Sequence, residues 1–139
     1  MAEYPFAAVQ TTPTEEPLPL FKEYAWDFDE DCFLYDVNGE HILLKGNDAI
    51  RIWCYKALKT DRFMYLAYTR GYGIELYPFM AKVMGVQQRK SELKRMIVEC
   101  LMVNPYITSI ESVTFDETER GEDMEIHIVM TTIYGELVI

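Results

Sequence analysis

The sequence predicts a single α+β domain, in which a hairpin over residues 33–44 and a strand pair over residues 106–134 form a small antiparallel sheet with about three helices packed on it. Three observations support this prediction. The chain of 139 residues suits one domain, its middle shows apolar residues at helical spacing, and its last third alternates apolar with polar residues as strands do. We expect the domain to cover residues 23–139 and to follow an extended arm formed by residues 1–22.

The N-terminal arm is rich in proline, threonine and acidic residues, a composition typical of an extended segment that adds little to a core. Its prolines are Pro5, Pro13, Pro17 and Pro19. Its apolar residues include Phe6, Leu18, Leu20 and Phe21. A purely solvated leader does not need these apolar side chains, so two interpretations stay open: a loose leader, or an arm that lies on a neighbouring protein.

The start of the domain carries the pattern of short strands. Residues 23–28 alternate aromatic with polar side chains, which predicts an opening strand or an edge segment. Asn38-Gly39 then predicts a tight hairpin over residues 33–44, because both residues readily take the positive φ angles of such a turn. We therefore expect His41 to be a strand residue and not a catalyst.

The middle of the chain predicts two shorter helices around one strand. Residues 49–58 place apolar side chains on one face of a first core helix. Residues 62–68 are apolar nearly throughout, which predicts a short buried strand or an extended segment. Residues 74–84 predict a second helix, with Pro78 in its first turn and Gly85 as its stop. The residues expected to face inward from this helix are Leu76, Phe79, Met80 and Val83.

The longest predicted helix covers residues 87–104, or begins at Ser91, and in both cases Asn104-Pro105 ends it. Its apolar face consists of Leu93, Met96, Ile97, Cys100 and Leu101. On another side Glu92, Arg95 and Glu99 follow at i, i+3 and i+7, so Arg95 can reach a carboxylate one turn above and one below. This charged stripe is either a solvated helix face or part of an interface with a partner protein.

The last third predicts two antiparallel strands, residues 107–115 and 124–134, joined by an acidic turn of residues 116–123. Residues 135–139 continue in extended form to an apolar end. That end either pairs within its own sheet or leaves a strand edge to which another chain can add. The residues predicted to form this second part of a partner interface are Ile133, Tyr134, Leu137, Val138 and Ile139.

Composition argues against several classes of function. Two His and three Cys residues lie far apart without the spacing of a metal site, so no metal or cofactor is predicted. A net charge of -10 argues against free nucleic acid as a ligand, and no apolar stretch approaches the roughly eighteen residues of a membrane span. The odd cysteine count suits a reducing compartment, the cytoplasm in which we expect the chain to be made.

The charge is unevenly distributed along the chain. Residues 1–40 carry ten acids and one base, residues 41–105 five acids and eleven bases, and residues 106–139 eight acids and one base. This alternation favours contact between oppositely charged protein surfaces, within the chain or across an interface. The alternative is that the acidic ends only keep the protein soluble.

The order of these features resembles the XkdS-like proteins of contractile phage tails, over about residues 23–136. The residues that carry the likeness in the first half are 23–28, Val37-Asn38-Gly39, 60–68 and Tyr72-Gly73-Ile74-Glu75-Leu76. In the second half they are Glu92-Leu93-Lys94-Arg95, Leu101, Asn104-Pro105 and Thr132-Ile133-Tyr134-Gly135. The XkdS-like proteins are similar to the wider gene 25-like group, which includes the TssE subunit of type VI secretion baseplates.

The resemblance implies a structural component of the baseplate wedge, located in the baseplate of a virion tail or tail-like particle and made in the bacterial host cytoplasm. It implies a small α+β fold like the handshake domain of the sheath protein, to which sheath arms add strands and thereby template sheath growth. The implied partners are other wedge proteins, the tail sheath protein and a hub or tube-initiator protein, with six copies in a ring.

The wider group also carries a Glu-Pro-Arg signature that holds the wedge core bundle together. The matching place here is Glu92-Leu93-Lys94-Arg95, which has no proline and one extra residue. The resemblance therefore implies an interface role for Glu92 and Arg95.

Two other functions were weighed against this one. The wider group bears an old lysozyme label, and a glycosidase needs two carboxylates about 5 to 9 Å apart, one of them protonated. Glu75 and Glu99 are the nearest candidates, but both are more simply solvent-facing, so we predict a structural protein and no enzyme. The second alternative is a cytoplasmic adaptor unrelated to tails, whose gene would not lie beside genes for tail parts.

Overall fold

The computed structural model describes residues 16–80, 82–117 and 124–139, and it confirms the predicted α+β class. Residues 1–15 of the arm and residues 118–123 of the predicted acidic turn lie outside the described residues. Three helices and seven strands follow one another within the described ranges. None of the helices there has the length and apolar character needed to span a bilayer.

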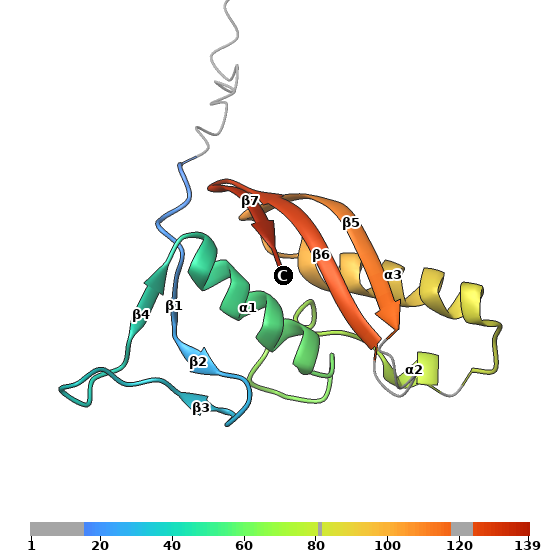
Figure 1. The fold of residues 1–139 in the computed structure, drawn as a ribbon, viewed down its shortest axis with the longest axis horizontal. Coiled ribbons are helices and arrows are strands. Elements are labelled where there is room, and N and C mark those ends of the chain that lie inside the picture. Colours follow the sequence, from blue (N-terminus) through green and yellow to red (C-terminus); the bar gives the residue numbers. More distant parts are fainter. Residues whose placement is uncertain (1–15, 81, 118–123) are drawn as a thin grey trace, which may run out of the picture.

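The centre of the molecule is a layered unit of one sheet and two helices (Figure 1). Strands β5 (Ile107–Glu117), β6 (Met124–Thr132) and β7 (Gly135–Val138) form an antiparallel sheet in the order β5-β6-β7. Helices α1 (Asn47–Lys59) and α3 (Val86–Met102) lie along one face of this sheet and contact each other. The predicted strand pair, the first core helix and the long helix are thus confirmed.

The core lies between the two helices and the sheet. Its largest fully buried side chains are Ile50 and Cys54 from α1, Ile97, Cys100 and Leu101 from α3, and Ile128 and Met130 from β6. They follow helical spacing on the helices and alternate on the strand, which is why periodicity identified their elements. Burial raises the pKa of the Cys54 thiol to about 12 and that of Cys100 to about 11, so both thiols stay protonated as core side chains.

The N-terminal part forms two small strand pairs of its own. β1 (Lys22–Tyr24) pairs with β4 (Leu43–Lys45), and β2 (Trp26–Asp27) pairs with β3 (Cys32–Phe33), in both cases antiparallel. The prediction that the 33–44 hairpin joins the C-terminal strands in one sheet is therefore wrong. Residues 22–27, which precede the turn, run beside the strands on both sides of it. β3 and β4 therefore pair with β2 and β1 and not with the C-terminal strands. The β1-β4 pair also packs on α1.

The turn at Asn38-Gly39 forms by a different mechanism from the predicted one. Of these two residues only Gly39 has a positive φ, 80°. The Asp36 carboxylate accepts hydrogen bonds from the backbone N–H groups of Asn38 at 2.8 Å and Glu40 at 3.0 Å. A turn held by an aspartate side chain thus replaces the two-residue hairpin turn. His41 lies just beyond it in an isolated β-bridge.

Residues 62–68 form a loop, so the predicted buried strand is wrong. The base of the loop is closed by a single parallel bridge between Asp61 and Ile74, and the Arg62 N–H donates to the Ile74 carbonyl at 3.0 Å. The bridge does not extend into a longer ladder, because residues 62–64 after Asp61 and residues 71–73 before Ile74 form turns and bends. The apolar side chains of the run consequently have no sheet to pack into.

The second predicted helix, residues 74–84, is reduced to α2 (Tyr77–Met80). Ile74 is held in the bridge described above, so the helix cannot begin there, and Pro78 fits only its first turn. The prediction of an inward face is correct in part: Leu76 and Phe79 pack against the core, whereas Met80 is 73% exposed and Val83 is fully exposed.

The described end of the arm, residues 16–21, lies against the domain. The Tyr106 hydroxyl donates to the Pro19 carbonyl at 2.6 Å, and the Phe21 N–H donates to the Tyr134 hydroxyl at 2.9 Å. The rings of Phe21 and Tyr106 meet edge to face with centroids 4.7 Å apart. These contacts hold the last arm residues beside the start of β5 and the β6–β7 turn.

Candidate partner interfaces

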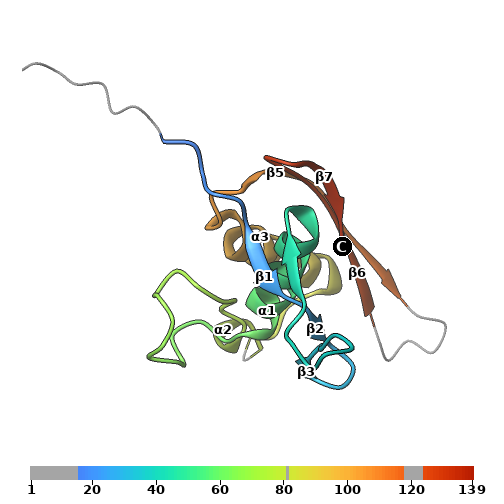
Figure 2. The same ribbon diagram turned by 90° about the vertical axis from the view of Figure 1, so that its left-hand side faces the viewer.

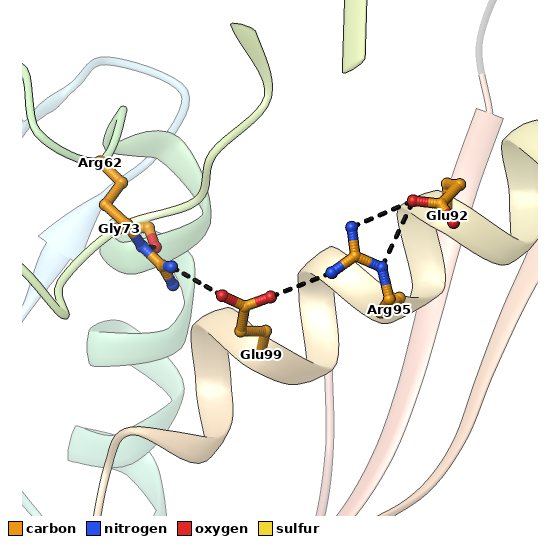
Figure 3. Close-up of polar contacts among 5 residues, drawn as sticks. All are labelled: Arg62, Gly73, Glu92, Arg95 and Glu99. Carbon is orange, nitrogen blue, oxygen red and sulfur yellow. Dashed lines mark hydrogen bonds and ion pairs between the residues drawn. The ribbon is translucent and has the colours of Figure 1, made fainter. Parts of the chain in front are cut away.

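A series of charged side chains links α3 to the loop after α1 (Figure 3). Arg95 Nη2 lies 3.0 Å from Glu92 Oε2, and Arg95 Nη1 lies 3.3 Å from Glu99 Oε2. The other oxygen of Glu99 accepts from Arg62 Nη1 at 2.8 Å, and Arg62 Nε donates to the Gly73 carbonyl at 3.2 Å. The predicted pairing of Arg95 with a carboxylate on each side is present, and Arg62 extends it into the loop.

The two ends of this charged network differ in exposure. The Arg62 side chain is 9% exposed, whereas Arg95 is 61% and Glu92 is 38% exposed. Ion pairs at exposed positions contribute about 0.2–1 kcal/mol, while a buried guanidinium depends on its hydrogen-bond partners. Arg62 therefore holds the loop to α3, and Glu92 and Arg95 retain surface that a partner can reach.

A cavity of about 220 Å³ lies beside the charged network, and Glu75 and Lys82 line it together with the network side chains. Both carboxylates considered for hydrolysis, Glu75 and Glu99, thus face one cavity. Glu99 accepts hydrogen bonds from two guanidinium groups, and Glu75 is exposed. Glu99 is thus placed among charged partners and not in the apolar surroundings typical of the acid of a glycosidase.

The predicted C-terminal interface residues divide into two groups. Val138 is 49% exposed, Ile133 46% and Tyr134 37%. Leu137 is only 3% exposed and belongs to the core, against which Ile139 also packs. At this end of the chain Ile133, Tyr134 and Val138 therefore present side chains to the surface, while Leu137 and Ile139 attach β7 to the helices.

The backbone of β7 leaves hydrogen-bonding groups on its outer edge. Ile128 and Ile139 exchange two hydrogen bonds of 2.8 and 2.9 Å. Because hydrogen-bonding direction alternates along an antiparallel strand, Glu136 and Val138 direct their N–H and C=O groups away from β6. Asn47 Nδ2 donates to the Glu136 carbonyl at 3.2 Å. Within the described residues, the outward groups of Val138 have no partner.

The opposite edge of the sheet, on β5, is less regular. Its register with β6 shifts twice, between Ile107 and Ser109 and between Ile110 and Ser112. At its far end Glu117 lies 3.7 Å from Lys90 of α3. Bulges and charged side chains on an edge strand disfavour the addition of another strand. Of the two edges, β7 is thus the more regular one.

Sequence reasoning missed the roles of Arg62 and Asn47. Gly46 occupies the N-cap position of α1, and no side chain caps the helix. The Asn47 amide instead binds the Thr132 hydroxyl and the Glu136 carbonyl at the β6–β7 turn. No local pattern could have shown this, because the contacts depend on where the sheet lies over the start of α1.

The exposed strand edge, surface charges and apolar loop on a small α+β core define a protein that works through contacts with other proteins. The model of the family of contractile injection system sheath initiators matches residues 22–135, and the chain belongs to this family. One similar protein is the phage-like element PBSX protein XkdS of Bacillus subtilis (strain 168), 30% identical over 96 residues, which are 68% of this chain and 67% of that protein. The resemblance seen in the sequence is confirmed, and the chain has a structural role related to the sheath of a contractile tail.

Proposed function

We propose that this chain links the baseplate wedge to the first disc of the contractile sheath and templates sheath assembly by strand addition at the β7 edge. The observation that supports this most directly is the pair of outward backbone groups at Val138, on an edge strand of regular register. A strand from the sheath protein would pair with β7 and become the fourth strand of the β5-β6-β7 sheet. Backbone hydrogen bonds would supply affinity, and alternate side chains would supply register.

Asn47 limits where such a strand can pair. Its amide already binds the Glu136 carbonyl, and Ile139 pairs with Ile128, so the incoming ladder would form at Val138. Glu92 and Arg95 would contact the wedge on a separate face, and six copies would form a ring around the hub or tube initiator. The arm of residues 1–22 would add a further contact to a neighbour. This role makes and breaks no covalent bonds, so we assign no catalytic residue.

The test of strand addition is Val138→Pro, with Val138→Ala as the matched control. Proline removes an N–H group that points away from β6, so the β6-β7 ladder stays intact while the outer edge loses its donor. We expect tails with Val138→Pro to carry complete baseplates with few or no full-length sheaths in electron micrographs, and Val138→Ala to assemble normally. Full-length sheaths on Val138→Pro tails, or on tails lacking the chain, would refute the templating role.

The wedge contact is tested by charge reversal. We expect Arg95→Glu to leave the fold unchanged by circular dichroism but to weaken association with wedge proteins, because three carboxylates would then adjoin on α3. Arg51→Glu, at an exposed position of α1, is the control. Unchanged association of Arg95→Glu would mean that the charged stripe is only a solvated helix face. Clearing of peptidoglycan by the purified protein, abolished by Glu75→Gln, would favour the hydrolase alternative.

A further inference from the structure

The loop between α1 and α2 exposes large apolar side chains. They are Phe63 at 63%, Met64 at 72%, Tyr65 at 57%, Leu66 at 107% and Tyr68 at 51%. Figure 2 shows this loop projecting from the body on the side away from the β5-β6-β7 sheet. Met80 at the end of α2 and Val83 after it are exposed as well. Contiguous apolar surface of this kind marks a binding site on a soluble protein.

An apolar cavity of about 270 Å³ joins the two exposed segments. Phe63 and Met64 line it from the loop, and Pro78 and Met80 line it from α2. Arg62, Glu75 and Pro78 line both this cavity and the one beside the charged network, so the two lie next to each other. A partner seated here would meet apolar side chains in its centre and charges at its border, which is the usual anatomy of a protein interface.

The loop is fixed at its base, which prepares its apolar side chains for binding. Arg62 donates to the Gly73 carbonyl and pairs with Glu99, and Ile74 donates its N–H to the Thr60 carbonyl at 2.9 Å. A Cβ atom at Gly73 would lie 2.6 Å from that same Thr60 oxygen, so the two sides of the loop base are in close contact. A pre-ordered loop loses less conformational entropy when a partner binds.

The surroundings of the loop are basic in a protein that is acidic as a whole. Residues 61–95 carry seven basic and three acidic residues, a net charge of +4, whereas the chain has a net charge of -10. Within the described residues Arg62, Arg95 and Lys90 pair with carboxylates. Exposed basic residues without an ion pair there are Arg70, Lys82, Arg89 and Lys94. Asp61 and Glu75 are the exposed acids of this segment without an ion pair among the described residues, so its unpaired charges sum to +2 and favour a ligand of negative charge.

We infer that residues 61–68 with Met80 and Val83, here named the basic apolar face, bind an acidic amphipathic segment of another baseplate protein. Its apolar side chains fill the cavity beside Phe63, and its carboxylates lie near Lys82 and Arg89. The inference rests on the proposed function for the kind of particle in which the partner is found. The chemistry of the partner follows from the surface itself.

The decisive experiment places the photo-crosslinker p-benzoylphenylalanine at Leu66 in the full chain while tails assemble in the cell. We expect mass spectrometry to find a crosslink to a net-negative segment of a different baseplate protein, with apolar residues at three- and four-residue spacing. The same probe at Val37, which is equally exposed in the Asp36–Glu40 turn, is the control and should not yield that crosslink. Crosslinks only to a second copy of this chain, only to a segment without net negative charge, or to nothing would each overturn the inference.

A second measurement tests the charges. We expect Lys82→Glu with Arg89→Glu to lower the crosslink yield at Leu66 by about tenfold or more, since each reversal places like charge against the partner. Arg51→Glu with Lys59→Glu on α1 makes the same change in net charge and should leave the yield unaltered. An equal fall in both double variants would refute local charge recognition.

The outcomes also separate the inference from the proposed function. If tails contain the chain and grow full sheaths while Leu66 yields no such crosslink, the inference fails and the proposed function stands. If tails lacking the chain grow full sheaths, the proposed function fails.

Discussion

Residues 60–85 and residues 86–139 differ in a way that composition alone does not predict. Apolar residues make up 15 of 26 in the first region and 24 of 54 in the second, so the first is the more apolar. Yet within the described residues the first buries one apolar side chain, Ile74, and the second buries ten. The difference is periodicity: α3, β5 and β6 repeat their apolar residues at the spacing of a helix or a strand, and the loop does not. Periodic apolar residues find partners in their own chain, and the others remain available to another molecule.

The largest expected effect compares two leucines across this boundary. Leu101 is fully buried, and Leu66 is fully exposed. We expect Leu101→Ala to lower the free energy of unfolding by about 2–5 kcal/mol, because it leaves a cavity between the helices and the sheet. Leu66→Ala should change it by no more than about 0.5 kcal/mol. Urea denaturation of both variants measures these changes. A large loss of unfolding free energy for Leu66→Ala would show that Leu66 packs against the rest of the domain.

The next effect concerns two glycines of positive φ. Gly73 has φ 97° and Gly39 has φ 80°, but only at Gly73 would a Cβ atom clash, 2.6 Å from a backbone carbonyl oxygen. An L-residue at positive φ costs about 1–2 kcal/mol by itself, which is the loss we expect for Gly39→Ala. Gly73→Ala should cost more, since the loop base must open. Thermal denaturation of the two variants measures these losses of stability. Equal losses for Gly73→Ala and Gly39→Ala would mean that the loop base accommodates a Cβ atom at little cost.

A smaller contrast lies within the charged network. Arg62→Met removes a largely buried guanidinium that binds Glu99 and the Gly73 carbonyl, and we expect a loss of about 1–3 kcal/mol of unfolding free energy. Glu92→Gln removes a partner of the exposed Arg95 and should cost under about 1 kcal/mol. Guanidinium chloride would screen both pairs, so urea is the denaturant of choice. Similar losses for the two variants would place Arg62 and Arg95 in the same structural role.

The same boundary separates what the sequence could predict from what it could not. The face of α3 with Ile97 and Leu101 and the strand pair around Val113 and Ile128 follow from period alone, because their contacts repeat along one element. The strand predicted for residues 62–68 was wrong, because an apolar run without alternation fits a buried strand and an exposed binding loop equally well. The prediction that the 33–44 hairpin and the C-terminal strands form one sheet failed because strand order depends on contacts far apart in the sequence.

The candidate interfaces follow the same rule. Glu92, Arg95 and Glu99 lie three and four residues apart on one helix, so their pairing was predictable. Arg62 reaches Glu99 from 37 residues away, and Asn47 reaches Glu136 from 89 residues away. Such contacts depend on the packing of whole elements and leave no pattern in the local sequence.

The smallest expected effect lies in the well-predicted region, at the second register shift of β5. Glu111 accepts hydrogen bonds from the Ser109 hydroxyl at 2.6 Å and the Thr131 hydroxyl at 2.9 Å, and these bonds lower the pKa of its carboxyl from the usual 4.5. Because the pKa is lowered in the folded state, the ionised carboxylate stabilises the fold above the pKa of the unfolded chain, and this contribution is lost as the pH falls through the folded pKa. Thr131→Val should raise the pKa toward its usual value, whereas Thr114→Val, on the same face of β5, should not. Side-chain carboxyl titration by NMR measures both. A midpoint unchanged by Thr131→Val would show that the strand irregularity alone, without its hydroxyl donors, determines the ionisation of Glu111.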